Sequence, residues 1–169
     1  MMQGEGRVTS FDIHESKISL ISDGAKRLSL KNVYADTCDA TAPREEFFGS
    51  ADRVICDVPC SGLGVLAKKP DLRYKNPDGI KDLPTLQYEI LSASAKYLKA
   101  GGVLLYSTCT LLPEENEEVV KKFLENNKDF HAKDFKIGDI SSADGCFTFI
   151  PHVHKTDGFF VSLIKKDTV

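Results

Sequence analysis

Two cysteines in this sequence stand in surroundings that suit thiol chemistry. Cys60 lies in "DVPCSGLG", residues 57–64, and Cys109 lies in "STCT", residues 107–110, and each follows an apolar run. A thiolate is a strong nucleophile, but an unperturbed cysteine has a pKa of about 8.5. An active cysteine therefore needs a positive or dipolar neighbour at neutral pH. The pair, with Asp57 beside the first cysteine, indicates covalent catalysis as the candidate chemistry.

Composition limits the classes of protein that could use these thiols. The 169 residues are 41% hydrophobic and 28% charged, which suits one globular domain with a real core. The sequence contains no apolar run of membrane-spanning length, and its first ten residues lack the regions of a signal peptide, so we expect a cytoplasmic protein. An odd number of cysteines without a CxxC pair favours reduced thiols over disulfides or zinc; they are Cys38, Cys56, Cys60, Cys109 and Cys146.

Short apolar runs predict the strands that must position the cysteines. Residues 53–58, "RVICDV", and 102–108, "GVLLYST", are near-continuous apolar runs, typical of strands buried on both faces of a parallel sheet. Two earlier strands are expected over 7–13 and 32–36. The tail, with "CFTFI" at 146–150 and "FFVSLI" at 159–164, predicts two antiparallel strands.

Helical periodicity separates these strands. Ile18, Ile21, Ala25 and Leu28 share one helical face. A second helix is expected from Pro84, with an apolar stripe that includes Leu98 and a glycine stop in "KAGG" at 99–102. A third is expected over 113–126, with acids in its first turn that suit the helix dipole. This alternation predicts an α/β fold with an open, mostly parallel sheet and antiparallel carboxy-terminal strands.

Ligands of such sheets gather at the carboxyl ends of the strands. Asp12, Asp36 and Asp57 end the first three predicted strands, and Cys109 follows the fourth, so we expect these four groups on one rim. Each alone has a plainer interpretation, because an aspartate at a strand end often caps a helix and a single cysteine is often packing. Their joint placement favours a site.

These residues resemble the Sun-type (Fmu-type) RNA cytosine-5 methyltransferases, which use S-adenosylmethionine. The resemblance runs over nearly the whole chain, through "VTSFDIHESK", "DVPCSGLGVLAKKPDLRYK", "LLYSTCTLLPEENEEVV" and "TDGFFVSLIKK". It implies a Rossmann-like methyltransferase fold in which Asp12 holds the ribose of the cofactor and Asp36 lies by its adenine. By the same resemblance Asp57 borders the cofactor and contacts the target cytosine, Cys109 is the nucleophile, and Cys60 resolves the intermediate.

The chemistry of cytosine explains why such residues are needed. Carbon 5 is too electron-poor to take a methyl group directly, so a thiolate adds to the neighbouring ring carbon and makes carbon 5 nucleophilic. A carboxyl group such as Asp57 can bond the exocyclic amine and ring nitrogen and favour this addition. The free N–H groups of the helix that starts near Pro113 could stabilise the Cys109 thiolate, although Glu114 and Glu115 oppose the effect.

The segment "KKPDLRYK", residues 68–75, is expected to meet the RNA, either ribosomal or transfer RNA. Lys68, Lys69 and Arg73 are the candidate phosphate contacts, with a solvated loop as the plainer alternative. The target base has to be unstacked or single-stranded to reach two cysteines. For Gly62 and Gly64 we favour a loop that the target nucleotide approaches closely, over a simple turn.

One departure from the family pattern concerns the cofactor loop. In this fold a glycine-rich loop follows the first, central strand, upstream of the ribose-binding acid, whereas here that acid is already residue 12. We therefore expect residues 1–169 to be a single but incomplete catalytic domain that lacks this strand and loop. Such a chain alone is expected to be inactive, to bind S-adenosylmethionine weakly or not at all, and to self-associate through uncovered sheet edges.

Two other functions stay open. In DNA cytosine-5 methyltransferases the cysteine of a "PC" motif attacks the base, but there glutamine normally follows, where this chain has Ser61. The absence of the cofactor loop would also suit a non-catalytic RNA-binding scaffold.

Overall fold

The structure is a computed structural model that describes residues 2, 5–74 and 77–168. Its internal contacts gather in two compact units, Met1–Glu45 and Glu46–Val169. Each unit has its own sheet, and each is described by itself. The prediction of a single incomplete catalytic domain over residues 1–169 stays a prediction.

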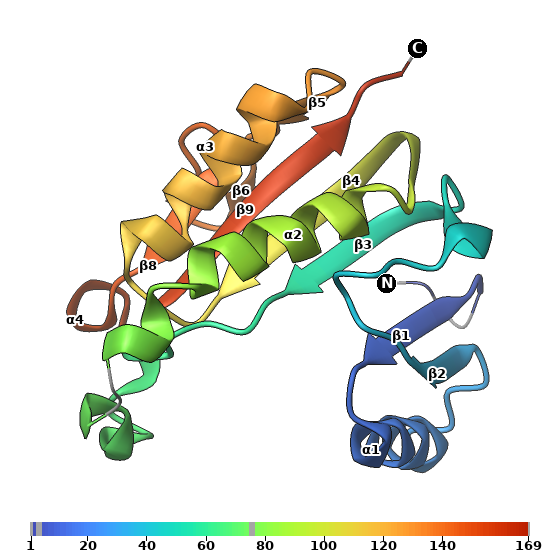
Figure 1. The fold of residues 1–169 in the computed structure, drawn as a ribbon, viewed down its shortest axis with the longest axis horizontal. Helices are drawn as coiled ribbons and strands as arrows, with labels where there is room; N and C mark the ends of the chain where they lie inside the picture. The colour runs from blue at the N-terminus through green and yellow to red at the C-terminus, as the bar shows by residue number, and fades with distance from the viewer. Residues whose placement is uncertain (1, 3–4, 75–76, 169) are drawn as a thin grey trace. The chain divides into compact units, whose positions relative to one another are not determined.

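The first unit is a strand–helix–strand crossover (Figure 1). Strand β1 (Val8–Asp12) and strand β2 (Val33–Thr37) are parallel, and helix α1 (Glu15–Arg27) connects them. Asp12 pairs in register with Thr37, so the two strands end level with each other. These elements confirm the strands and helix that the sequence predicts for residues 7–36.

The second unit contains the mixed sheet. Strand β3 (Ala51–Asp57) is parallel to β4 (Leu98–Thr108), which is antiparallel to β9 (Phe159–Lys166). Two further antiparallel strands pair with β9: β5 (Phe130–Ala132) and β8 (Cys146–Phe149). The predicted α/β fold, with parallel strands first and antiparallel strands at the carboxyl end, is thus confirmed.

Helices α2 (Leu83–Ala95) and α3 (Glu117–Asn126) lie side by side on one face of this sheet (Figure 1). Their apolar faces meet the strands in one core, where Leu91, Phe123 and Phe160 are fully buried. Burying such large apolar side chains stabilises the unit and keeps the ends of β3 and β4 in register.

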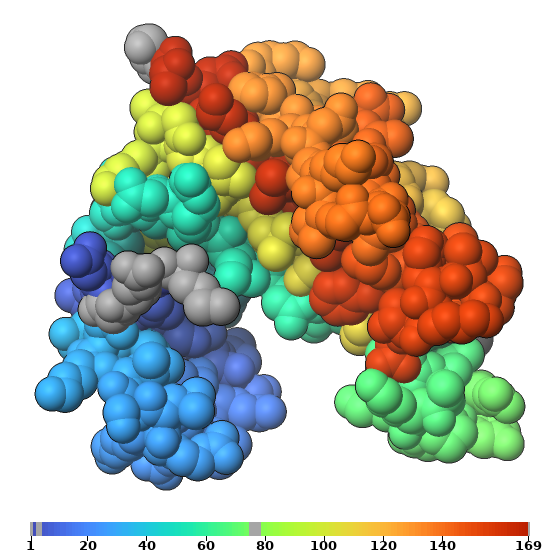
Figure 2. Space-filling view, turned by 180° about the vertical axis from the view of Figure 1, so that it is seen from behind, coloured from blue at the N-terminus to red at the C-terminus, as the bar shows by residue number. Residues whose placement is uncertain are grey.

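The remaining elements are short. They are the strands β6 (Lys136–Ile137) and β7 (Ile140–Ser141), the helix α4 (Pro151–His154), and the 3-10 turns η1 (Glu45–Phe47), η2 (Leu63–Val65), η3 (Pro70–Tyr74), η4 (Pro77–Ile80) and η5 (Pro113–Glu115). Seen from behind, the segment between β5 and β8, which holds β6 and β7, lies in front of part of the sheet (Figure 2). In the described part of the chain, every helix is too short or too polar to cross a membrane.

Two predictions about the strands are wrong in detail. Helix α2 ends at Ala95, and Leu98 already belongs to β4. Glycines 101 and 102 instead form an irregularity within β4, where Gly101 has a φ of 75° and the pairing with β3 shifts register. Nor is β3 buried on both faces, because Ile55 is 76% exposed.

Strand β3 pairs only with β4 among the strands of the described residues, which leaves its other edge open. An open edge with an exposed apolar side chain such as Ile55 can pair with another chain. Self-association of this chain therefore stays a prediction, with a physical basis in β3.

Candidate active site

The two predicted cysteines lie together at the carboxyl ends of neighbouring parallel strands. Cys60 comes three residues after β3, and Cys109 directly follows β4. Their sulfur atoms are 3.0 Å apart, and the backbone N–H of Cys109 donates to the sulfur of Cys60 at 3.2 Å. Both are free and partly buried. A separation this short lets one thiol pass a proton to the other.

The two sulfurs differ in their surroundings. Burial, and then the hydrogen bond with Cys109, raise the pKa of the Cys60 thiol to about 12. Both effects favour the protonated form of Cys60, whose sulfur lies within hydrogen-bond distance of the sulfur of Cys109. Cys56, on β3, is also held neutral, because burial raises its pKa to about 11. It packs in the core and takes no part in the pair.

Asp57 ends β3 on the same rim as the cysteines. In register it faces Ser107 of β4, and Oδ1 of Asp57 accepts a hydrogen bond from the Ser107 hydroxyl at 2.9 Å. The residue is exposed, unlike Ser107. The carboxylate is thus oriented by its neighbouring strand while it remains accessible to a ligand.

The glycines after Cys60 have structural roles. Gly62 has a φ of 77°, a left-handed conformation that glycine adopts without strain. Gly64 packs between two backbones: its N–H donates to the carbonyl of Cys109 at 2.9 Å, and its carbonyl accepts from the N–H of Gly158 at 2.8 Å. These contacts hold the Cys60 loop against the Cys109 loop, and the close approach of a nucleotide to this loop stays a prediction.

A group of buried polar side chains beneath the cysteines went unrecognised in the sequence. The hydroxyl of Ser61 donates to Oγ1 of Thr110 at 2.8 Å, which links the residues that follow the two cysteines. From the sequence we expected Glu115 to interact favourably with the dipole of the helix. In the structure it is fully buried, and its Oε2 accepts a hydrogen bond from the backbone N–H of Ser61 at 2.9 Å. Glu114 is exposed, as the dipole interpretation requires. The sequence gives no sign of which of the two neighbouring glutamates is buried, because both have the same local surroundings in "PEENE".

Asp12 and Asp36 lie in the first unit, at the ends of β1 and β2. Oδ1 of Asp12 accepts the backbone N–H of His14 at 2.9 Å, just before helix α1. Asp36 forms an ion pair with Arg44 at 2.7 Å, and the hydrogen bonds from Arg44 and Thr37 hold the pKa of its carboxyl below the usual value. Asp12 thus stabilises the turn before α1 and Asp36 pairs with a basic side chain, and the cofactor roles of both acids stay predictions.

The predicted phosphate contacts are exposed: Lys68 and Lys69 lie between the 3-10 turns η2 and η3, and Arg73 lies on η3. Lys68 pairs with Asp157 at 2.6 Å, so part of its charge is already neutralised. Lys69 and Arg73 are exposed. Lys75, the last residue of the basic segment, lies outside the described residues.

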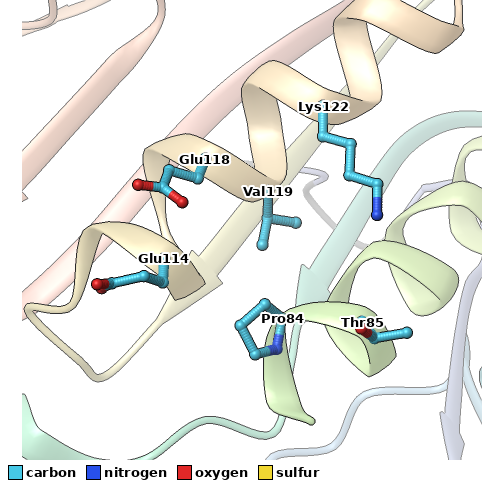
Figure 3. Close-up of a pocket in the computed structure, with 6 residues that line it drawn as sticks. All are labelled: Pro84, Thr85, Glu114, Glu118, Val119 and Lys122. Atoms are coloured by element: carbon cyan, nitrogen blue, oxygen red, sulfur yellow. The ribbon is translucent and has the colours of Figure 1, made fainter. Parts of the chain in front are cut away.

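The cavities do not coincide with the cysteine pair. One of about 280 Å³ lies between the start of α2 and the start of α3, where Val119 points toward Pro84 and the carboxylates of Glu114 and Glu118 point away from it (Figure 3). Another, of about 450 Å³, lies between α3 and the segment around Cys146. Neither contains a predicted site residue. Within residues 5–74 and 77–168, no cluster of three or more His, Cys, Asp or Glu side chains could hold a metal ion.

Comparisons with known proteins identify the family of the chain. The family model described as 16S rRNA methyltransferase RsmB/F matches residues 1–165. The chain is 38% identical to a probable ribosomal RNA small subunit methyltransferase B of Bacillus subtilis, over 98% of this chain and 39% of that protein. It is 37% identical to the corresponding protein of Synechocystis, with the same two coverages. The chain thus spans about two fifths of the length of these relatives.

Solved structures give the same result. NSun6 from Pyrococcus horikoshii with SFG, an analogue of S-adenosylmethionine, matches with a TM-score of 0.80 and 30% identity, over 99% of this chain and 43% of that one. A methyltransferase homologue from the same organism matches with a TM-score of 0.82 and 30% identity, over 98% and 55%. The fold is therefore that of the S-adenosylmethionine-dependent methyltransferases, and this chain belongs to the 16S rRNA methyltransferase RsmB/F family.

Proposed function

We propose that this chain carries the catalytic cysteines of an enzyme that methylates carbon 5 of cytosine in RNA, with ribosomal RNA favoured over transfer RNA by the matched family. The observation that carries the proposal is the pair of thiols 3.0 Å apart at the ends of β3 and β4, with the accessible carboxylate of Asp57 on the same rim. Covalent activation of a pyrimidine requires a nucleophilic thiol and a group that polarises the base.

The cofactor would supply the methyl group as an electrophilic sulfonium, and the residues of the first unit fit it. Carboxylates at the ends of parallel strands can accept hydrogen bonds from ribose hydroxyls, as proposed for Asp12, and Asp36 would lie by the adenine.

In the proposed reaction the sulfur of Cys109 adds to carbon 6 of cytosine, and the electron pair of the ring double bond makes carbon 5 nucleophilic. Asp57 would hold the exocyclic amine and ring nitrogen during this step. After carbon 5 has gained the methyl group, its proton leaves to solvent, the double bond reforms, and the bond from carbon 6 to Cys109 breaks.

Cys60 fits the last of these steps. Its sulfur lies 3.0 Å from the sulfur of Cys109, so the S–H of Cys60 can donate a hydrogen bond to the thiolate of Cys109 as the bond to carbon 6 breaks. The sequence also makes Cys60, or a water that it positions, a candidate for the base that removes the carbon 5 proton, and this alternative stays open.

The product identifies the reaction. The full-length protein would be incubated with a small-subunit ribosomal RNA transcript and methyl-labelled S-adenosylmethionine, and the RNA digested to nucleosides. We expect the label in 5-methylcytidine. Label in another nucleoside would contradict the proposal, and cofactor and RNA binding without any transfer would support the non-catalytic scaffold. A matched DNA duplex serves as the control for the DNA methyltransferase alternative.

The basic loop gives a separate prediction about RNA binding. If Lys69 and Arg73 contact phosphates, each alanine variant should weaken binding regardless of RNA sequence and lower the salt dependence by about one unit per contact. Lys68→Ala should have a smaller effect, because Lys68 already pairs with Asp157. Filter binding across a series of salt concentrations measures the slope, with Lys121→Ala on α3 as the control. An unchanged slope in all three loop variants would identify the loop as solvated surface.

A further inference from the structure

Glu115 ends the 3-10 turn η5, Asn116 follows it directly, and the two residues are 0% and 1% exposed. Burying a carboxyl group or an amide costs several kcal/mol unless hydrogen bonds compensate it. Their partners are therefore informative about why two such polar residues lie inside the protein.

Glu115 holds the backbone on both sides of Cys60. Its Oε2 accepts the N–H of Ser61 at 2.9 Å and the side-chain N–H of Gln87 at 2.8 Å. The same Gln87 amide donates to the carbonyl of Pro59 at 2.9 Å. The peptide groups before and after Cys60 are thus attached to one buried pair of side chains.

Asn116 does the same for Cys109. Its Oδ1 accepts the hydroxyl of Thr108 at 2.6 Å, and its Nδ2 donates to the carbonyl of Thr110 at 3.1 Å. Thr108 and Thr110 are fully buried, so these bonds are shielded from water. Glu115 thus holds the backbone on both sides of Cys60, in part through Gln87. Its neighbour Asn116 bonds the residues on both sides of Cys109.

The turn is itself attached to the sheet. The hydroxyl of the buried Tyr106, on β4, donates to the backbone carbonyl of Glu115 at 2.7 Å. Burial raises the pKa of this hydroxyl, which keeps it protonated as a donor. Tyr106 thereby anchors η5 to the strand that ends next to Cys109.

We propose that Glu115 and Asn116 are positioning residues that set the separation of the Cys60 and Cys109 sulfurs. They would act through Gln87 and the backbone rather than by touching a substrate. Their effect on the thiol pair depends on geometry alone, and only its consequence for adduct release rests on the proposed function.

The carboxyl group offers a conservative test. Oε2 of Glu115 accepts both hydrogen bonds, while Oε1 is buried and has no hydrogen-bond partner among the described residues. Glu115→Gln can keep a carbonyl oxygen for both donors, whereas Glu115→Ala removes it. If these two hydrogen bonds position Cys60, its position should be retained in Glu115→Gln and lost in Glu115→Ala.

The thiol pair can be measured without any methylation. In this chain, with Cys38 and Cys146 replaced by serine, oxidised glutathione would convert the two thiols into a Cys60–Cys109 disulfide and two molecules of reduced glutathione. The equilibrium gives the effective concentration of one thiol toward the other. We expect it to fall about 10- to 100-fold in Glu115→Ala and Asn116→Ala and to stay near the parent value in Glu115→Gln.

A matched control separates positioning from stability. Val119→Ala removes a buried apolar side chain from α3, the helix that follows the turn, so it should lower the melting temperature without changing the thiol equilibrium. If the alanine variants do not fold, Gln87→Met tests the same link with a side chain of similar size. An equilibrium in folded Glu115→Ala, Asn116→Ala or Gln87→Met equal to that of the Val119→Ala control would overturn the proposal.

The methylation assay then shows which proposal fails, if one does. In the full-length protein, Glu115→Ala should slow release of the RNA adduct, and Glu115→Gln should restore it. A changed thiol equilibrium without any adduct in the parent protein would keep the positioning role and reject the proposed function. An adduct in the parent protein, with an unchanged thiol equilibrium in the alanine variants, would support the proposed function and reject the positioning role.

Discussion

We expect Cys109→Ala to abolish both methylation and every covalent protein–RNA species, and Cys60→Ala to accumulate a denaturant-resistant RNA adduct in the presence of cofactor. The first variant lacks the sulfur that forms the bond to the base. The second keeps the nucleophile but lacks the S–H that lies 3.0 Å from the departing sulfur. Loss of such a proton donor should slow release by about 10²- to 10⁴-fold.

Denaturing electrophoresis of labelled RNA with each full-length variant measures the adduct directly. Cys146→Ala, a partly buried cysteine that bonds Ser162, is the matched control and should behave like the parent protein. The reverse pattern, with the adduct lost in Cys60→Ala and trapped in Cys109→Ala, would indicate the arrangement of the DNA enzymes. Wild-type turnover in both variants would leave the two thiols as packing residues.

The second large effect is expected at Gly64. A Cβ atom at this position would lie 2.8 Å from the carbonyl oxygen of Cys109 and 2.6 Å from the carbonyl carbon of Gly158, so two backbones would have to move apart. Overpacking of this kind typically costs about 1–3 kcal/mol, and here the displaced segment includes Cys109. Gly64→Ala should therefore lower the melting temperature and reduce methylation more than stability alone explains.

Gly24→Ala is the matched control for this variant. Gly24 lies inside α1, and nothing would lie within 4 Å of an added Cβ atom, so alanine should stabilise the helix by up to about 1 kcal/mol. Thermal unfolding by circular dichroism compares the two. A Gly64→Ala protein with the parent's melting temperature and activity would show that the Cys60 and Cys109 loops do not depend on this contact.

The sequence predicts the strands and their order well, because short apolar runs such as 53–58 and 102–108 are stable mainly as strands within a sheet. It places Cys60, Cys109 and Asp57 on one rim for the same reason, since parallel neighbours end at the same edge. It misjudges the end of α2, because Leu98 continues the helical stripe although it begins β4. Local periodicity cannot show that sheet pairing with Ala51 outweighs one more helical turn.

The buried polar residues are harder to predict. Nothing in "PEENE" separates the exposed Glu114 from the buried Glu115, because the difference arises from the distant Ser61 and Gln87. The role of Gly64 likewise depends on backbone far along the chain, at Cys109 and Gly158. Sequence patterns report short-range periodicity, whereas these contacts arise only when the chain has folded.

The cysteine that carries the RNA can be identified directly with 5-fluorocytosine at the target position. Fluorine at carbon 5 leaves no proton to remove after methyl transfer, so the adduct of the full-length protein persists. Trypsin separates the two candidates, because Cys60 falls in the peptide 54–68 and Cys109 in the peptide 100–121. We predict that mass spectrometry finds the nucleotide on Cys109, in peptide 100–121. A nucleotide on Cys60, in peptide 54–68, would contradict the proposed roles of the two thiols.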